Sequence, residues 1–170
     1  MNIHLVDKTF IKQPKHYILQ SLLAVIAVAV ILYFVEIITH AAIVAALGAS
    51  SFIVFAMPKT VAAEPRRLIG GHIIGILCGL ACYYGWHHTS FGSLFDTVEF
   101  LHWLPAAIAV GLSILLMTIF NFEHPPAAGT ALGIVTHGWS METIIFIVAF
   151  AVSLAIIGAI LKKYLKNLCT

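Results

Sequence analysis

One short segment of the chain combines an ionisable imidazole with residues that force a change of backbone geometry. Glu123 and His124 are followed at once by Pro125 and Pro126. Because proline is tolerated in the first turn of a helix but not in its interior, this order predicts a short helix that begins at the prolines. An anion could bind at the positive end of such a helix, and His124 could carry a proton because histidine titrates near neutral pH.

Other polar residues of the apolar segments are candidates for contact with the same anion. His72 lies one turn inside a long apolar run, and Ser50 lies in a shorter one. Ionisable groups inside membrane segments are functional by default, and a hydrogen bond to a neighbouring helix is the structural alternative. The candidate substrate-binding residues are His124, Pro125, Pro126, Gly129, Thr130, His72, Ser50, Asn121 and Arg66, and the candidates for proton coupling are His124 and Glu123.

Several of these residues also have a purely structural interpretation. Arg66 and Arg67 would anchor a cytoplasmic loop, which we favour over attraction of an anion, and Glu64 would neutralise one of them. Glu123 is either half of a carboxylate–imidazole pair with His124 or a cap at the end of the membrane segment. No metal or cofactor is expected, because neither the three cysteines nor the histidines of the polar loop at 87–102 have ligand spacing.

The composition indicates the class of protein that holds these side chains. Of the 170 residues, 61% are hydrophobic and 9% are charged, whereas soluble domains carry about 25% charged residues. The chain is therefore predicted to be an all-α, polytopic membrane protein in contact with the lipid bilayer. We expect an interfacial or cytoplasmic arm at 1–16, one transmembrane domain at 17–161 and a basic cytoplasmic tail at 162–170.

Six apolar runs are predicted to cross the bilayer, four of them long and two short. The short run at 125–138 would span about 21 Å as a pure helix, whereas the bilayer core is about 30 Å thick. We expect a broken crossing there, part helix and part extended, with a re-entrant loop as the alternative. The long runs are 17–35, 68–86, 104–120 and 141–161, and the other short run is 41–57.

A stripe of glycines marks the run at 68–86. Gly71, Gly75 and Gly79 recur every four residues, which places them on one face of a helix. Small residues at this spacing allow two helices to approach closely. The stripe therefore predicts a tightly packed helix neighbour, either within this chain or in a partner protein.

The positions of the charges predict the orientation of the chain. All nine lysines and arginines lie in the arm, in the loop at 59–67 or in the tail. Because lysine and arginine concentrate in cytoplasmic loops, both termini should be cytoplasmic, which requires an even number of crossings and therefore favours six over five. The strings at 40–48 and 124–133 align with one gap, which suggests a 3+3 inverted repeat; chance agreement between alanine-rich strings is the alternative.

The nine residues from His124 to Leu132, His-Pro-Pro-Ala-Ala-Gly-Thr-Ala-Leu, resemble the signature of the HPP family of integral membrane proteins. The resemblance extends over about residues 20–160, and the family is usually described with four transmembrane helices. Members from cyanobacteria and chloroplasts are associated with nitrite transport, so the resemblance implies an anion substrate of this kind. The other blocks that carry it are Gly48–Ser50, Pro58, Glu64–Arg66 and Leu68–His72.

Together, the residues and the resemblance predict a transporter or channel for a small inorganic anion, nitrite first, with proton coupling as a further expectation. With no soluble regulatory domain or transit peptide evident, we expect a stand-alone homo-oligomer in a bacterial inner membrane. The alternative is a non-transporting scaffold that docks through the glycine stripe. An intramembrane enzyme is less favoured, because neither G-x-S-x-G nor H-E-x-x-H occurs, and nothing supports a nucleic-acid partner.

Overall fold

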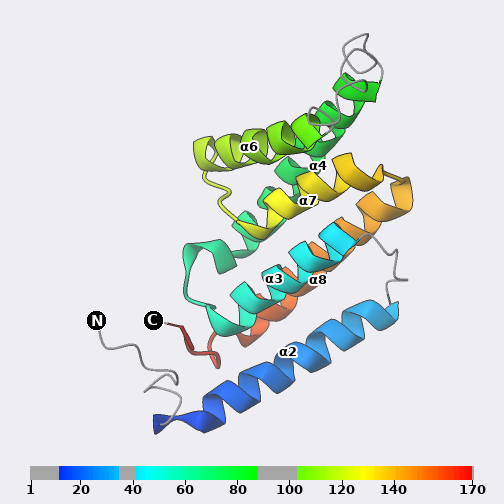
Figure 1. The fold of residues 1–170 in the computed structure, drawn as a ribbon. Helices are drawn as coiled ribbons and strands as arrows, with labels where there is room; N and C mark the ends of the chain where they lie inside the picture. Colours follow the sequence, from blue (N-terminus) through cyan, green and yellow to red (C-terminus); the bar gives the residue numbers. More distant parts are fainter. Residues whose placement is uncertain (1–11, 35–40, 88–102, 170) are drawn as a thin grey trace.

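The computed structural model describes residues 12–34, 41–87 and 103–169, and these residues form helices and turns without a β-strand. The all-helical prediction is therefore confirmed for the described part of the chain. His40 and the polar loop at 88–102 lie outside it. The elements are α2 (Pro14–Phe34), α3 (Ala41–Ala56), the 3-10 helix η1 (Val61–Ala63), α4 (Pro65–His87), α6 (Leu104–Ile119), α7 (Pro126–His137) and α8 (Met141–Leu161) (Figure 1).

Three of the six described α-helices are long and three are short, whereas four long and two short crossings were predicted. Helices α2, α4 and α8 have 21, 23 and 21 residues, whereas α3 and α6 have 16 each and α7 has 12. Among the described residues, Pro65–Trp86 and Met141–Leu161 are long and apolar enough to cross a membrane, and Ala42–Ala56 and Leu104–Ile119 are shorter apolar helices. The run at 104–120, expected to be long, is therefore one of the short ones.

The segment at 125–138 is a continuous helix, and the mixed helix-and-extended prediction for it is wrong. Helix α7 runs unbroken from Pro126 to His137, a length of about 18 Å. The non-helical residues precede it, at 120–125, because two consecutive prolines cannot continue a helix that arrives from the N-terminal side. Asn121 forms the turn there with a left-handed φ of 56°.

The glycine stripe of α4 is the surface on which α7 packs. A Cβ atom added at Gly71 would lie 2.7 Å from the Cβ of His124, and one at Gly79 would lie 2.9 Å from the Cβ of Ile134. At Gly75 it would collide with the carbonyl oxygen of Ala127. The prediction of a close helix contact is thus confirmed, and the contact lies inside the chain. The same pairs show that α4 and α7 run in parallel.

Helix α7 is enclosed by three neighbours, α4, α3 and α6 (Figure 1). Its face opposite α4 also carries glycines. A Cβ atom added at Gly129 would lie 3.0 Å from the Cβ of Ala46, and one at Gly133 would collide with the side chain of Ile43 at 2.6 Å. Small residues on two faces therefore let α7 sit between α3 and α4 at short distance.

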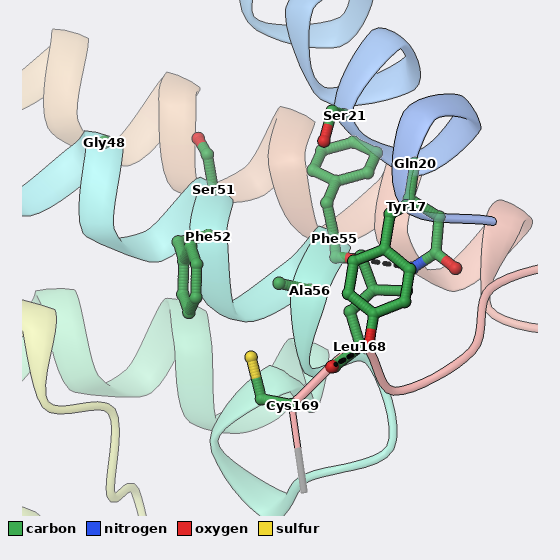
Figure 2. Close-up of a pocket in the computed structure, with 10 residues that line it drawn as sticks. All are labelled: Tyr17, Gln20, Ser21, Gly48, Ser51, Phe52, Phe55, Ala56, Leu168 and Cys169. Atoms are coloured by element: carbon green, nitrogen blue, oxygen red, sulfur yellow. Dashed lines mark hydrogen bonds between the residues drawn. The ribbon is translucent and has the colours of Figure 1, made fainter. Parts of the chain in front are cut away.

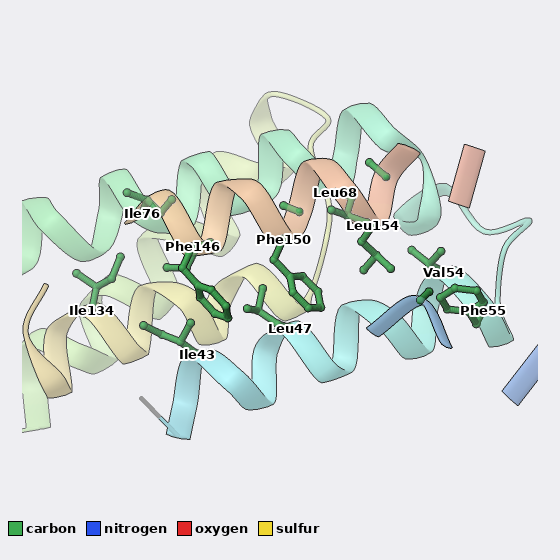
Figure 3. Packing of buried hydrophobic residues seen from close by; sticks show 14 of the residues in the cluster. Ile43, Leu47, Val54, Phe55, Leu68, Ile76, Ile134, Phe146, Phe150 and Leu154 are labelled. Atoms are coloured by element: carbon green, nitrogen blue, oxygen red, sulfur yellow. The ribbon is translucent and has the colours of Figure 1, made fainter. Parts of the chain in front are cut away.

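Large apolar side chains fill the other side of α3, where α8 packs. Phe146 and Phe150 of α8 lie against Ile43 and Leu47 of α3, and Leu154 lies further along, beside Val54 (Figure 3). Phe150 is 2% exposed and Leu154 is fully buried. This contact is filled by aromatic and branched side chains, whereas the contact between α4 and α7 is made by backbone approach, so the two interfaces are built in different ways.

The basic residues gather at one end of the helix bundle. There the turn after α3 meets the C-terminal tail, because the Leu168 N–H donates to the Ala56 carbonyl over 2.8 Å and the Lys59 N–H donates to Asn167 Oδ1 over 3.0 Å. Arg67, at the start of α4, pairs with Glu123 in the turn before α7. The described lysines and arginines are Lys12, Lys15, Lys59, Arg66, Arg67, Lys162, Lys163 and Lys166.

The C-terminal tail is folded onto this end rather than extending from it. Gln20, which is 2% exposed, donates through Nε2 to the carbonyls of Phe55 (2.5 Å) and Lys166 (2.8 Å), and accepts the Lys166 N–H through Oε1 at 3.0 Å. The Tyr17 hydroxyl donates to the Leu168 carbonyl over 2.8 Å. These contacts border a pocket of about 410 Å³ between α2, α3 and the tail (Figure 2).

Replacing Gln20 with alanine is expected to release this tail. The substitution leaves two carbonyls and one N–H without their partner, at a cost of about 1–3 kcal/mol. We expect a lower unfolding temperature in detergent and faster proteolysis after residue 161. The matched control is Gln13→Ala, because Gln13 is exposed and, among the described residues, its side chain bonds only the Lys166 ammonium, at 3.5 Å. Equal effects of the two substitutions would show that Gln20 does not hold the tail.

Candidate functional site

Four polar side chains meet inside the bundle, where α3, α4 and α7 come together. Ser50 comes from α3, His72 from α4, and Thr130 from α7, while His124 lies two residues before α7 begins. Ser50, His124 and Thr130 are 0% exposed and His72 is 1% exposed. All four were candidates from the sequence, and the fold brings them into one buried cluster.

The four side chains form one continuous hydrogen-bonded chain. Ser50 Oγ lies 3.0 Å from His72 Nε2 and 2.8 Å from His124 Nε2. His72 Nδ1 lies 2.9 Å from Thr130 Oγ1. At the other end, His124 Nδ1 donates to the Ala62 carbonyl over 2.8 Å. Every ring nitrogen of the two histidines therefore has a partner, as buried polar groups require.

Each part of this cluster has a local cause in the sequence. The two prolines stop the chain from being helical at His124, so its side chain turns towards Ala62 of η1 instead of following a helix face. The absence of a side chain at Gly71 leaves room for the His124 Cβ atom. His72 follows Gly71 on α4 and meets Thr130, which lies one turn into α7.

The first turn of a helix ordinarily leaves N–H groups free to bind an anion, but the first turn of α7 does not. Pro125 and Pro126 have no N–H, and the N–H groups of Ala127 and Ala128 donate to the carbonyls of His124 (2.9 Å) and Pro125 (3.1 Å). What remains for an anion is the positive end of the helix dipole and the His124 imidazole. The prolines shape this end of the helix without offering donors to a ligand.

Glu123 pairs with an arginine and not with His124. Its carboxylate binds the Arg67 guanidinium, whose Nε also lies 3.3 Å from Glu64 Oε2. Both nitrogens of His124 are already engaged by Ser50 and Ala62. The carboxylate–imidazole pair considered for proton coupling is therefore not formed, and Glu64 neutralises Arg67 as expected.

The remaining sequence candidates lie outside the buried chain. The Arg66 guanidinium is stacked 4.8 Å from the centre of the Phe122 ring at the basic end of the bundle. Asn121 is exposed in the turn before α7, and Gly129 faces Ala46 of α3. These three residues shape or flank the segment that holds His124. Sequence reasoning missed Ala62, and it favoured a topological role for Arg67 without predicting its pairing with Glu123.

One groove reaches the site from the side of α6. It has a volume of about 260 Å³ and lies between α6 and the start of α7. His124 contributes to its wall although its side chain is buried. Among the described residues, no group of three or more His, Cys, Asp or Glu side chains gathers to hold a metal ion. The groove is lined by Ile114, Met117, Thr118, Glu123, His124, Pro125 and Ala128.

The described helices are apolar, and two of them are long enough to cross a membrane, which is typical of an integral membrane protein. The chain belongs to the HPP family, since it matches the family described as HPP, transmembrane region, over residues 11–168. The resemblance noted from the sequence is thereby confirmed, and with it the membrane location of the chain.

One relative is a protein of Dictyostelium discoideum described as a transmembrane protein. It is 34% identical over 90 residues, which represent 53% of this chain and 28% of that protein. The matched stretch therefore spans less than a third of the relative's length. No solved structure matches this chain.

Proposed function

We propose that this protein is a transporter or channel for a small inorganic anion, with nitrite as the first substrate to test. The observation that carries the proposal is the buried chain of two imidazoles and two hydroxyls inside an otherwise apolar membrane domain. Burying such groups is costly, and in membrane proteins they mark ion and proton pathways. The choice of nitrite rests on the family resemblance.

The packing of the helices supports the proposed inverted repeat. In the repeat, α2 corresponds to α6, α3 to α7, and α4 to α8. When each helix is replaced by its counterpart, every principal contact between two helices becomes a contact that is also present in the structure. The contact of α4 with α7 becomes that of α8 with α3, and the contact of α6 with α7 becomes that of α2 with α3. Transporters built in this way bind their substrates where the short central helices of the two halves meet.

In this repeat the short central helices are α3, which carries Ser50, and α7, which carries Thr130. His124 lies two residues before α7 begins and contacts Ser50. The alternating course of six crossings would bring both termini to the side with the basic residues, which we propose is the cytoplasm. All four buried side chains are sealed in this structure. Passage of an anion therefore requires α7 to move relative to α3 or α4.

The groove beside α6 is the proposed approach to His124. An anion there would meet the positive end of α7, and protonated His124 would add a full positive charge. A titratable histidine holds the anion only while it is protonated, which suits release better than a permanent charge. Glu123, paired with the Arg67 guanidinium, would repel the anion from the same groove less than an unpaired carboxylate would.

The same contacts bear on the two alternative functions, a scaffold and an enzyme. A scaffold would need a docking face other than the glycine stripe, because α7 occupies that stripe. An enzyme could use the contact between Ser50 and His124, but Ser50 Oγ already has three partners and cannot meet a substrate without breaking one. We retain the further proposals of a homo-oligomer and of a bacterial inner membrane location.

The test is uptake of nitrite into proteoliposomes that contain the purified full-length chain. We expect saturable uptake above that of empty liposomes, and competition by nitrate or formate if the site recognises small anions in general. Absence of uptake for nitrite, nitrate, formate and chloride would contradict the transport proposal and would leave the scaffold as the better explanation.

A further inference from the structure

The number of protons in the buried chain restricts how its members can be bonded. Ser50 Oγ has three partners, the Ala46 carbonyl at 3.1 Å and the Nε2 atoms of His72 and His124, but the hydroxyl carries one proton. His124 Nδ1 must carry a proton, because a carbonyl oxygen only accepts. The direction of the Ser50 O–H bond therefore determines the protonation of the two histidines.

When both histidines are neutral, one arrangement satisfies every contact between the four side chains. The Thr130 hydroxyl donates to His72 Nδ1, and His72 Nε2–H donates to Ser50. The Ser50 hydroxyl in turn donates to His124 Nε2, and His124 Nδ1–H donates to Ala62. All four donors point the same way along the chain. The two neutral histidines thus carry opposite tautomers, with the proton on Nε2 in His72 and on Nδ1 in His124.

Adding one proton reverses part of this chain without moving a heavy atom. When movement of α7 admits water beside Thr130, a proton binds His72 Nδ1, and Thr130 changes from donor to acceptor there. His72 passes its Nε2 proton to Ser50 while Ser50 passes its own proton to His124 Nε2. The positive charge then lies on His124, and His72 is neutral again with its proton on Nδ1. The two ring centres are 5.2 Å apart.

We propose that Ser50 is the proton-transferring link between His72 and His124, so that one proton taken up beside Thr130 becomes a positive charge at the anion site. This proposal rests on the proposed transport function and names the coupling device within it. Arg67, Glu64 and Glu123 are the other charged groups near His124, and they pair with one another. The described parts of α3 and α6 contribute no ionisable group, and the only one on α7 is His137, at its far end.

The relay makes a prediction that does not depend on transport. The full chain, labelled with ¹⁵N-histidine and placed in lipid bilayers, is titrated with acid while nuclear magnetic resonance reports the protonation of each ring nitrogen. We expect His72 on the Nε2–H tautomer and His124 on the Nδ1–H tautomer at high pH. As His124 gains its second proton, His72 should change to the Nδ1–H tautomer at the same midpoint without becoming charged.

The substitution Ser50→Ala removes the link and should uncouple these events, so that His72 no longer changes tautomer when His124 titrates. Ser51→Ala is the matched control, because Ser51 is the next residue of α3 and, within the described part of the chain, its hydroxyl bonds only the Leu47 carbonyl, at 3.1 Å. It should leave the coupled change intact.

If His72 keeps one tautomer throughout the titration of the unsubstituted protein, or if the coupled change survives in Ser50→Ala, the relay is overturned, whether or not the protein transports nitrite. Lack of nitrite uptake together with the coupled change would instead contradict the transport function and leave the relay standing.

Discussion

Substituting His124 with alanine is expected to lower nitrite uptake at least about tenfold, which corresponds to about 1.4 kcal/mol. The imidazole is the one ionisable group in the wall of the groove that is not paired with an opposite charge. Uptake by the unsubstituted protein should rise as the pH falls from about 8 to about 6, because protonation of a histidine creates the charge that attracts the anion. The variant should have lost this dependence on pH.

Loss of function through misfolding has to be separated from loss of the imidazole. His124→Asn serves this purpose, because its side-chain N–H can still donate to the Ala62 carbonyl while the contact with Ser50 is removed. We expect this variant to fold and to lack the pH-dependent uptake. His137→Ala, at the far end of α7, is the control histidine and should transport normally. Undiminished, pH-dependent uptake by His124→Asn would remove His124 from the mechanism.

Adding one methyl group at Gly75 is expected to destabilise the fold more than any surface substitution. The new Cβ atom would collide with the Ala127 carbonyl oxygen and would lie 3.4 Å from the Cβ of Thr130. Neither backbone can yield, because α7 is also pressed against α3 through Gly129 and Gly133. Overpacking of this kind costs about 1–3 kcal/mol. Thermal unfolding in detergent should show a clear decrease for Gly75→Ala, and uptake should fall because Thr130 is displaced.

Gly85→Ala is the matched control on the same helix. A Cβ atom at Gly85 meets no heavy atom of the described residues within 4 Å, so alanine should be neutral there or stabilising by up to about 1 kcal/mol through its higher helix propensity. The opposite signs of the two substitutions would identify the contact between α4 and α7 as the cause. Equal stability of both variants would show that the two helices are packed less closely than the structure has them.

The local signals in the sequence predicted local features correctly. The His-Pro-Pro order predicted where α7 begins, because proline restricts the backbone whatever surrounds it. The repeat of Gly71, Gly75 and Gly79 predicted a close helix contact, because residues four apart share a helix face. The prediction that the segment at 125–138 is part helix and part extended was wrong. The non-helical residues precede the prolines, and α7 itself is a continuous helix.

Contacts between distant segments could not be predicted in the same way. Charge attraction alone allows Glu123 to pair with either His124 or Arg67. The fold places the start of α4 beside the turn before α7, and this placement selects Arg67 as the partner. Gln20 is an unremarkable polar residue in an apolar run. Its burial follows from a C-terminal tail that returns about 146 residues later to occupy its amide.

By itself, the sequence determined the class of the protein, the approximate positions of its helices, the clustering of its basic residues and the candidates for carrying a proton. These follow from composition, periodicity and proline chemistry, which act over a few residues. The tertiary structure alone decided that Ser50 lies between His72 and His124. That arrangement needs three helices to meet within hydrogen-bond distance, and it is the glycine faces of α4 and α7 that allow the helices to come so close.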